Sequence, residues 1–266
     1  MDVPILNASA WREYRGKPSS SGINETTHLA KIADQSGQLH NCFVKLMAPG
    51  SPALLCEAIG WILASASGVT CPQFAGIVLI PIDELRKHVA LPAHFNGMTL
   101  CPAWFSEVVA GKAVLQIHKM KFFLARKTCL RSKDVRKIAA FDQWSDLRDR
   151  NFGNVIQSSK GGYVAIDHET LLHDLLWLSV AVWEERSLLE EARSALPSSE
   201  FKRFQIDMAT ASTAHSPALD SSKKAVENII QKLLPRHAQD LSSAVIDLLE
   251  KRSAAEWLPN KLGVIA

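Results

Sequence analysis

Two acids and an amide are concentrated in one short polar segment, "DLRDRNFGNVIQSSKGGYVAIDHE", residues 146–169. Asp149 and Asn154 are five positions apart, and Asp167 directly follows a short apolar stretch. Carboxylate and amide oxygens are the ligands that Mg²⁺ prefers, and a further carboxylate can orient an attacking hydroxyl. This order and spacing are typical of phosphoryl transfer from ATP. We therefore expect Asp149 to hold the nucleophile, and Asn154 and Asp167 to hold the metal ion.

The same three residues also have a purely structural explanation. Asp149 and Asn154 are of types that are common in turns, and Asp167 could cap a helix beginning near Thr170. The motif alone does not distinguish the two explanations, because D-x-x-x-x-N arises often by chance.

A lysine and a glutamate earlier in the chain favour the catalytic explanation. Lys45 stands in the apolar strand "CFVKLM", where an unpaired charge would be costly, and Glu57 is the acid of the apolar helix that follows. A strand lysine paired with a helix glutamate holds the α- and β-phosphates of ATP in protein kinases. The alternative is that Lys45 reaches solvent at the strand edge and that Glu57 lies on the outer face of its helix.

The segment before this strand has the composition of a loop that could cover phosphates. Its backbone N–H groups and hydroxyls would come from Ser19, Ser20, Ser21 and Gly22. The segment is not a G-x-G-x-x-G motif, and a flexible surface turn is the alternative.

Together these segments, from "SSSGINETTHLAKIAD" and "HNCFVKLM" to "FDQWSDLRDRNFGNVI" and "GGYVAIDHE", resemble the HipA-like kinases, particularly the short single-domain HipT-like group. The catalytic segment is also similar to the kinases that phosphorylate phosphatidylinositol. The resemblance runs from about residue 15 to the C-terminus and includes "RSAAEWLPNKLG". It implies a bacterial serine/threonine protein kinase that uses ATP and Mg²⁺ and is often the toxin of a toxin–antitoxin system.

The resemblance also implies partners and a mode of regulation. Aminoacyl-tRNA synthetases are known substrates in that family, and a cognate antitoxin is an expected partner. Lys45, Glu57, Asp149, Asn154 and Asp167 take the roles argued above. Phosphorylation in the phosphate loop can restrain such kinases, which makes the serines from Ser19 to Ser21 expected autophosphorylation sites.

The chain departs from the family pattern at several positions. Leu147 stands where the family often has Asn, and Glu169 stands where many kinases have Gly after the metal-binding Asp. No Lys lies between Asp149 and Asn154, so Arg148 or Arg150 would neutralise the γ-phosphate, unless each pairs with an acid of the fold. Two other functions therefore remain open: a kinase of lipids or small hydroxyl compounds, and a pseudokinase that serves as a binding module.

The local patterns predict an α+β, two-lobed, protein-kinase-like fold, with a β-rich N-lobe at residues 1–105 and a helical C-lobe at 106–266. We expect strands at 27–34, 39–47, 73–82 and 97–105, the last interrupted at Pro102, and a strand–turn–strand over 153–167. We expect helices at 51–69, 133–147, 171–183, 186–196, 222–234 and 238–258. The small, polar stretch 208–222 reads as an exposed connection.

Composition restricts the class of protein further. The chain has 266 residues and a formal net charge of +3, and no apolar run approaches the ~20 residues needed to cross a bilayer. Its five cysteines form no metal-binding or CxxC pattern and indicate buried free thiols. We expect a cytoplasmic protein without direct nucleic-acid binding or a membrane span. The run from Lys112 to Lys137 has nine Lys and Arg against the single acid Asp134, which indicates either a solvated helical face or a site for an acidic partner.

Overall fold

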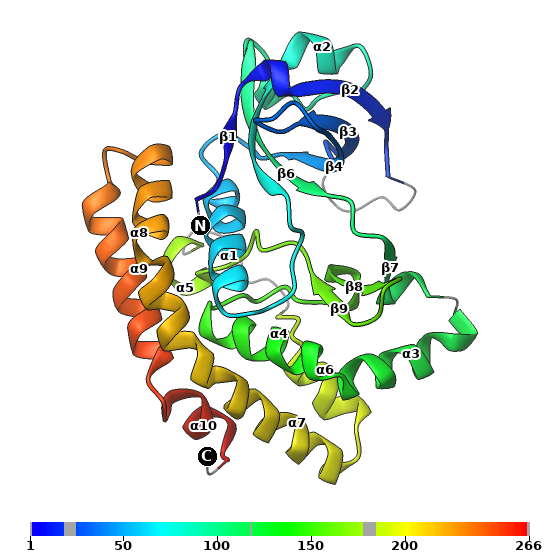
Figure 1. The fold of residues 1–266 in the computed structure, drawn as a ribbon, viewed down its shortest axis with the longest axis vertical. Helices are drawn as coiled ribbons and strands as arrows, with labels where there is room; N and C mark the ends of the chain where they lie inside the picture. The colour runs from blue at the N-terminus through cyan, green and yellow to red at the C-terminus, as the bar shows by residue number, and fades with distance from the viewer. Residues whose placement is uncertain (1, 19–24, 118, 178–184, 265–266) are drawn as a thin grey trace. The chain divides into compact units, whose positions relative to one another are not determined.

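The computed structural model describes residues 2–18, 25–117, 119–177 and 185–264 of the chain. The protein is mixed α/β, with a sheet region and a helical region (Figure 1). It divides into two compact units. The sheet unit comprises Asp2–Leu54 and Pro72–Val108, and the helical unit comprises Leu55–Cys71 and Val109–Ala266. The change of unit after Val108 is close to the boundary expected near residue 105, whereas residues 55–71 are grouped with the helical unit rather than with the first lobe.

The sheet unit is built on a six-stranded sheet in the order β1-β5-β6-β4-β3-β2. Only the β1–β5 pair is parallel among these neighbours. The strands are β1 (Ile5–Leu6), β2 (Trp11–Gly16), β3 (His28–Ala33), β4 (Leu39–Leu46), β5 (Ala75–Pro81) and β6 (Leu100–Glu107). Short helices accompany them: η1 (Ala8–Ala10), α2 (Ile82–Arg86) and η2 (Ala93–Phe95). The core contains Ile32, Val44 and Phe105, all fully buried.

Strands β3, β4, β5 and β6 lie where the sequence predicted them, with one correction, whereas β1 and β2 were not predicted. Strand β6 continues through Pro102, which pairs with Leu79 of β5, so the predicted interruption is wrong. Pairing of β6 with β4 ends at Leu46 and Ala103, so Pro102 has only one neighbouring strand. A proline is tolerated at such a position because its missing N–H removes no bond to a second strand.

The helical unit begins with most of helix α1 (Ala53–Ala66). Its predicted ends are confirmed: the Ala53 amide donates to Ser51 Oγ at 3.2 Å, and Gly68 follows the helix with φ 71°. The face of α1 that carries Cys56 is buried within this unit, where the Cys56 thiol donates to the Leu171 carbonyl at 3.1 Å. This apolar packing explains why α1 is grouped with the helices that follow it in the chain.

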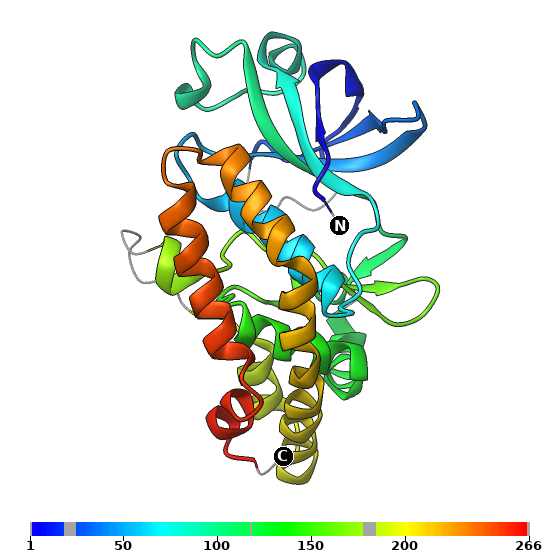
Figure 2. The same ribbon diagram turned by 60° about the vertical axis from the view of Figure 1, so that its left-hand side comes forward.

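The remainder of the helical unit combines a small sheet with a helical array. The sheet has the order β7-β8-β9, with β7 (Gly111–Ala113), β8 (Val155–Ser158) and β9 (Tyr163–Ala165). The helices are α3 (Lys119–Arg131), α4 (Lys133–Trp144), α5 (His173–Leu176), α6 (Leu188–Ala195), α7 (Ser198–Ala211), α8 (His215–Leu233), α9 (Ala238–Ser253) and α10 (Trp257–Leu262), with short 3₁₀ turns η3 (Val114–Gln116), η4 (Phe152–Asn154) and η5 (Ser212–Ala214). Figures 1 and 2 show α8 and α9 running side by side, joined by a short connection. None of the described helices combines the length and apolar character needed to cross a membrane.

One prediction for this unit needs correction. Residues 208–222 are not an exposed connection: they form the end of α7, the turn η5 and the start of α8, with Met208 and Leu219 buried. The hydroxyls of Ser212, Ser221 and Ser222 donate to backbone carbonyls three or four residues earlier, as Ser222 Oγ donates to the Ala218 carbonyl at 2.7 Å. Of the predicted helix at 171–183, the described part contains α5, which ends at Leu176, and 178–183 lie outside the described residues.

Candidate functional site

The loop that carries Asp149 is held to helix α4 by a buried ion pair. Arg150 is 0% exposed and Asp142 of α4 is 1% exposed, and the two are joined by three hydrogen bonds of 3.0 to 3.2 Å. Burial raises the pKa of Asp142, and the Arg150 guanidinium opposes that rise. Breaking such a pair by removing one partner leaves a buried charge without compensation, so the pair fixes the loop firmly against α4.

The same guanidinium also fixes the segment that carries Asp167. Arg150 Nη1 donates to the carbonyls of Asn154, Ile166 and Asp167, the first at 3.4 Å and the last at 3.3 Å. One buried side chain therefore connects the three places where the predicted catalytic and metal-binding residues stand. Asp149, Asn154 and Asp167 are themselves only partly buried, so their side chains can meet a ligand.

The Asn154 amide is oriented by its own loop. Its Nδ2 donates to the Asp149 backbone carbonyl at 3.0 Å, which makes Oδ1 the atom that could bind a cation. Asn151 supports the turn from the other side, since its Oδ1 accepts from the Gly153 amide at 2.7 Å and its Nδ2 donates to Asp149 Oδ1 at 3.3 Å. The D-x-x-x-x-N spacing thus corresponds to one closed loop from Asp149 to Asn154, which ends in η4, and both polar side chains are tied to it.

The β8–β9 hairpin brings Asp167 back beside this turn. Val155 pairs with Ala165, and the Ile166 amide donates to the Asn154 carbonyl at 3.1 Å. The hairpin reverses at Gly162, whose φ is 77°; a side chain there would lie 2.8 Å from Asp134 Oδ2. The predicted strand, Gly-Gly turn and strand are therefore confirmed, and they place Asn154 and Asp167 next to each other at one end of the hairpin.

Asp167 has a backbone conformation that few residues other than Gly adopt. Its φ is 64°, and Asp146 and Leu172 are the other non-glycine residues with positive φ in the described chain. Aspartate tolerates this region better than most residues, and such conformations are concentrated at functional sites. The predicted role of Asp167 as a helix cap is not observed, since the following helix α5 begins only at His173 and is preceded by Leu172.

Glu57 of α1 supports the Asp167 segment directly. Its Oε2 accepts from the backbone amide of His168 at 2.9 Å, and both side chains are buried. Helix and segment approach closely here because α1 has Gly60 at this point: a Cβ on Gly60 would lie 2.3 Å from His168 Cβ. Glu57 is therefore not on the outer face of its helix, and it contributes to the position of the residue next to Asp167.

The remaining predicted residues lie in the sheet unit or outside the described chain. Lys45 is half-buried on β4, opposite Trp104 of β6 and one residue beyond Val44, where the pairing of β4 with β3 ends; β4 itself lies between β6 and β3. It is thus on an interior strand rather than at the edge of the sheet. The expected pairing of Lys45 with Glu57 stays a prediction. The described residues do not include the predicted phosphate loop, which consists of Ser19, Ser20, Ser21 and Gly22.

The expectation that Arg148 or Arg150 neutralises a γ-phosphate is not supported, because both pair with acids of the fold. Arg148 forms ion pairs with Asp146 and Asp174, and Arg150 is committed to Asp142. The role of Asp142 was missed by sequence reasoning. Its signal was an acid within the apolar face "IAAFDQW" of a helix, which requires a buried cationic partner.

The cysteines offer no reactive group to this site. Cys42, Cys56, Cys101 and Cys129 are buried free thiols, as predicted, and Cys71 is partly buried. Burial raises the pKa of each, to about 12 for Cys42 and Cys129 and to about 11 for Cys101. In the described chain, no three His, Cys, Asp or Glu side chains form a group able to hold a metal ion, so a metal would depend on Asn154 and Asp167 with oxygen atoms from a ligand.

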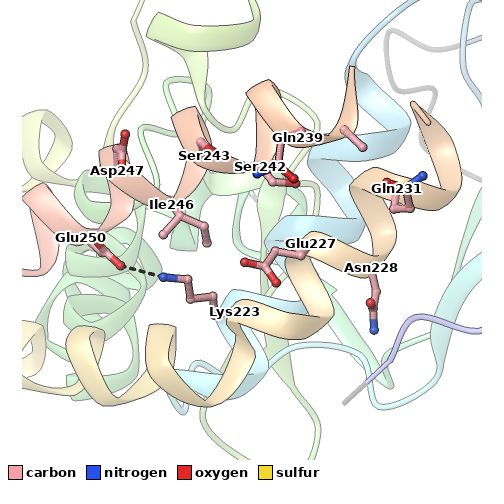
Figure 3. Close-up of a pocket in the computed structure, with 11 residues that line it drawn as sticks. Lys223, Glu227, Asn228, Gln231, Gln239, Ser242, Ser243, Ile246, Asp247 and Glu250 are labelled. Carbon is pink, nitrogen blue, oxygen red and sulfur yellow. Dashed lines mark hydrogen bonds and ion pairs between the residues drawn. The ribbon is translucent and has the colours of Figure 1, made fainter. Parts of the chain in front are cut away.

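A hollow of about 480 Å³ lies elsewhere in the helical unit, between α8 and α9. Figure 3 shows its polar lining, including the ion pair from Lys223 to Glu250 at 3.1 Å. Glu227 of α8 lies opposite Ser242 of α9 across it. None of the predicted site residues lines this hollow.

Comparison with known proteins adds no relative. The chain matches no protein-family model, and a search of curated proteins finds no match. The function must therefore be argued from the residues themselves.

Proposed function

We propose that the protein is an ATP-dependent kinase that transfers the γ-phosphate to a serine or threonine hydroxyl of another protein. The sheet unit and the helical unit would be the N-lobe and C-lobe of a protein-kinase-like fold. The observation that carries the proposal is the Arg150 guanidinium, which joins the loop of Asp149 and Asn154 to the segment of Asp167. Two segments that need only be turns would not require a fully buried arginine between them.

The residues fit the chemistry of phosphoryl transfer in distinct ways. Asp149, half-buried beside its turn, would accept the hydrogen bond of the attacking hydroxyl and hold that oxygen in line. Asn154 Oδ1 and the Asp167 carboxylate would hold Mg²⁺, which when bound neutralises charge on the phosphates. Lys45 would contact the phosphates, and Glu57 would keep the Asp167 segment in place through the His168 amide.

Intact-mass spectrometry and ADP formation in the presence of Mg²⁺ and ATP test this proposal. Wild type, Asp149→Asn, Asp167→Asn and the exposed control Asp247→Asn should be compared, each alone and with a cell lysate as a source of protein substrates. We expect Mg²⁺-dependent ADP formation and phosphate incorporation in wild type and control. Both should fall by about 10² or more in the other two variants.

Two added measurements separate the alternatives: Mg²⁺-dependent nucleotide binding by each sample, and turnover with a lipid extract in place of the cell lysate. Nucleotide binding without turnover in any sample would favour a pseudokinase that serves as a binding module. Turnover with lipid extract but not with protein would favour a lipid kinase. Absence of Mg²⁺-dependent nucleotide binding in wild type would overturn the proposal.

A further inference from the structure

Three large apolar side chains are unusually exposed around helix α3. Phe123 and Leu124 of α3 are 71% and 69% exposed, and Leu115 of η3 is 60% exposed. These fractions exceed those of the other exposed large apolar side chains in the described chain. Farther along α3, Cys129 and Leu130 are fully buried, so the exposed apolar side chains belong to the first half of a helix whose end is packed.

This part of the helical unit borders the loop that carries Asp149 and Asn154. The Phe122 ring meets the Phe152 ring edge-on at 6.0 Å, and the Arg126 guanidinium lies 5.8 Å from the same ring. Leu115 Cδ2 lies 3.7 Å from the position that a Cβ on Gly153 would occupy. Leu115 and the side of α3 that carries Phe122 and Arg126 therefore stand next to η4, Phe123 and Leu124 lie on the same helix, and Figure 1 shows α3 in the same part of the helical unit as β7 and β8.

The charged side chains that are exposed to solvent beside Phe123 and Leu115 are lysines. Lys127 is exposed one turn from Phe123 on the same side of α3, and Lys112 is exposed three residues before Leu115. The acid within this basic run, Asp134, faces inward and accepts from the Tyr163 amide at 3.1 Å.

We propose that Leu115, Phe123 and Leu124, with Lys112 and Lys127, form a docking surface for an acidic polypeptide segment that carries large apolar side chains. We call these five residues the α3 patch. Apolar side chains of the partner would cover Phe123 and Leu124, and its carboxylates would face the two lysines. Because the patch adjoins the loop of Asp149, we expect the docked segment to belong to the protein that is phosphorylated, and this part of the proposal rests on the proposed function. The binding of the segment does not depend on kinase activity.

A membrane surface fits the patch less well than a polypeptide. An interfacial helix needs a broad apolar face buried in the lipid headgroups, whereas the end of α3 is already packed on the protein. Acids also lie beside the patch, where Glu191 pairs with Arg126 at 2.5 Å and Glu200 pairs with Arg131 at 2.8 Å. These pairs neutralise two arginines beside the patch and so weaken its attraction for an anionic lipid surface, whereas an acidic peptide needs only the two lysines.

Selection from a display library of random twelve-residue peptides tests the proposal without any need for kinase activity. The full chain is used as bait, and the enriched peptide is then synthesised and its affinity measured by fluorescence anisotropy. The variants are Phe123→Glu with Leu124→Glu, Lys112→Glu with Lys127→Glu, and the control Ile206→Glu, an exposed apolar position on α7. Thermal unfolding checks that each variant remains folded.

We expect enriched peptides that combine Asp or Glu with Leu, Ile, Phe or Trp. Each double variant should weaken binding about tenfold or more, and Ile206→Glu should leave it unchanged. Failure to enrich any peptide, or equal binding by the Phe123→Glu and Leu124→Glu variant, overturns the proposal. So does the outcome in which only phosphatidylserine vesicles bind in a manner that depends on Phe123 and Leu124. Peptide binding by a wild-type protein that shows no Mg²⁺-dependent nucleotide binding or phosphotransfer would refute the proposed function alone.

Discussion

Two arginine–carboxylate pairs of the helical unit have similar geometry and different surroundings. Arg131 and Glu200 form two hydrogen bonds of 2.8 Å at the surface, with side chains 49% and 34% exposed. Arg150 and Asp142 form three hydrogen bonds with both side chains almost inaccessible to water. Only the buried pair reaches the backbone of the candidate site, through the carbonyls of Asn154, Ile166 and Asp167.

The difference shows which charges of this chain are structural. An exposed pair is screened by water and ions and contributes little to stability, whereas a buried pair is costly to break. A buried arginine that donates to the carbonyls of two loops also removes conformational freedom from both. The predictions below follow this contrast from its largest expected effect to its smallest.

Removal of one partner of the buried pair should have the largest effect. Arg150→Met leaves Asp142 ionised or newly protonated in an apolar site, and we expect the free energy of unfolding to fall by about 3–5 kcal/mol. Urea denaturation measures this change. The double variant Asp142→Leu with Arg150→Met should recover much of the stability but not the Mg²⁺-dependent turnover, because the two loops lose their shared donor. Equal stability of the single and double variants would contradict this account.

The contrast between buried and exposed charged groups also applies to a histidine of α8, which titrates near neutral pH in the unfolded chain. His215 stacks on Trp144 at 4.5 Å, and burial lowers its pKa from 6.5 to about 4. Between these values the unfolded chain binds the proton and the folded chain does not. Its contribution to stability is therefore complete above about pH 6.5 and is lost as the pH falls through about 4, which corresponds to about 3 kcal/mol.

Unfolding free energies measured from pH 7 to pH 4 check this prediction. His215→Phe keeps a ring against Trp144 and should lose less stability over this range than wild type. The control is His237→Phe at an exposed position, which should follow wild type. Parallel curves for wild type and His215→Phe would show that His215 does not carry the acid sensitivity.

The positive φ of Asp167 leads us to expect a smaller change in stability when this residue is replaced. Asparagine tolerates a φ of 64° better than alanine does, while both substitutions remove the carboxylate. Asp167→Ala should therefore be less stable than Asp167→Asn by about 1 kcal/mol, and both should lose Mg²⁺-dependent turnover. Differential scanning calorimetry of the two variants measures the difference; identical stabilities would show that the positive φ is not maintained in solution.

The smallest effect is expected at the surface pair. Arg131→Gln should leave the free energy of unfolding almost unchanged, and any loss should shrink further in 1 M salt, because water and ions already screen this exposed pair. Glu200→Gln serves as the matched partner variant. A loss as large as that of Arg150→Met would remove the distinction between the two pairs.

Local sequence patterns predicted a large part of the fold. The β3–β4 hairpin and the ends of α1 follow from a Gly-containing turn, a serine cap and a terminal glycine, each of which acts over a few residues. The prediction of an exposed connection at 208–222 was wrong because small and polar residues are compatible with either a loop or a helix. Packing of His215 on Trp144, far away in the sequence, is one of the tertiary contacts that stabilise the helix there.

The candidate site was predictable to a similar extent. Asp149 and Asn154 share one turn, so their spacing alone indicated their proximity. Arg150 was visible in the sequence, but its partner Asp142 and the carbonyl of Asp167 depend on how α4 and the β8–β9 hairpin pack. The sequence therefore identified the polar residues, while the structure identified what holds them.

Binding of Mn²⁺ with a non-hydrolysable ATP analogue tests the central claim most directly, since Mn²⁺ can replace Mg²⁺ and the free ion is measured by electron paramagnetic resonance. Wild type, Asn154→Ala, Asp167→Asn and the control Asp247→Asn should be titrated under one condition. We predict nucleotide-dependent Mn²⁺ binding by wild type and Asp247→Asn, and binding weaker by about tenfold or more in the other two variants. Unchanged binding by Asp167→Asn would contradict the claim that the segments joined by Arg150 form a metal–nucleotide site.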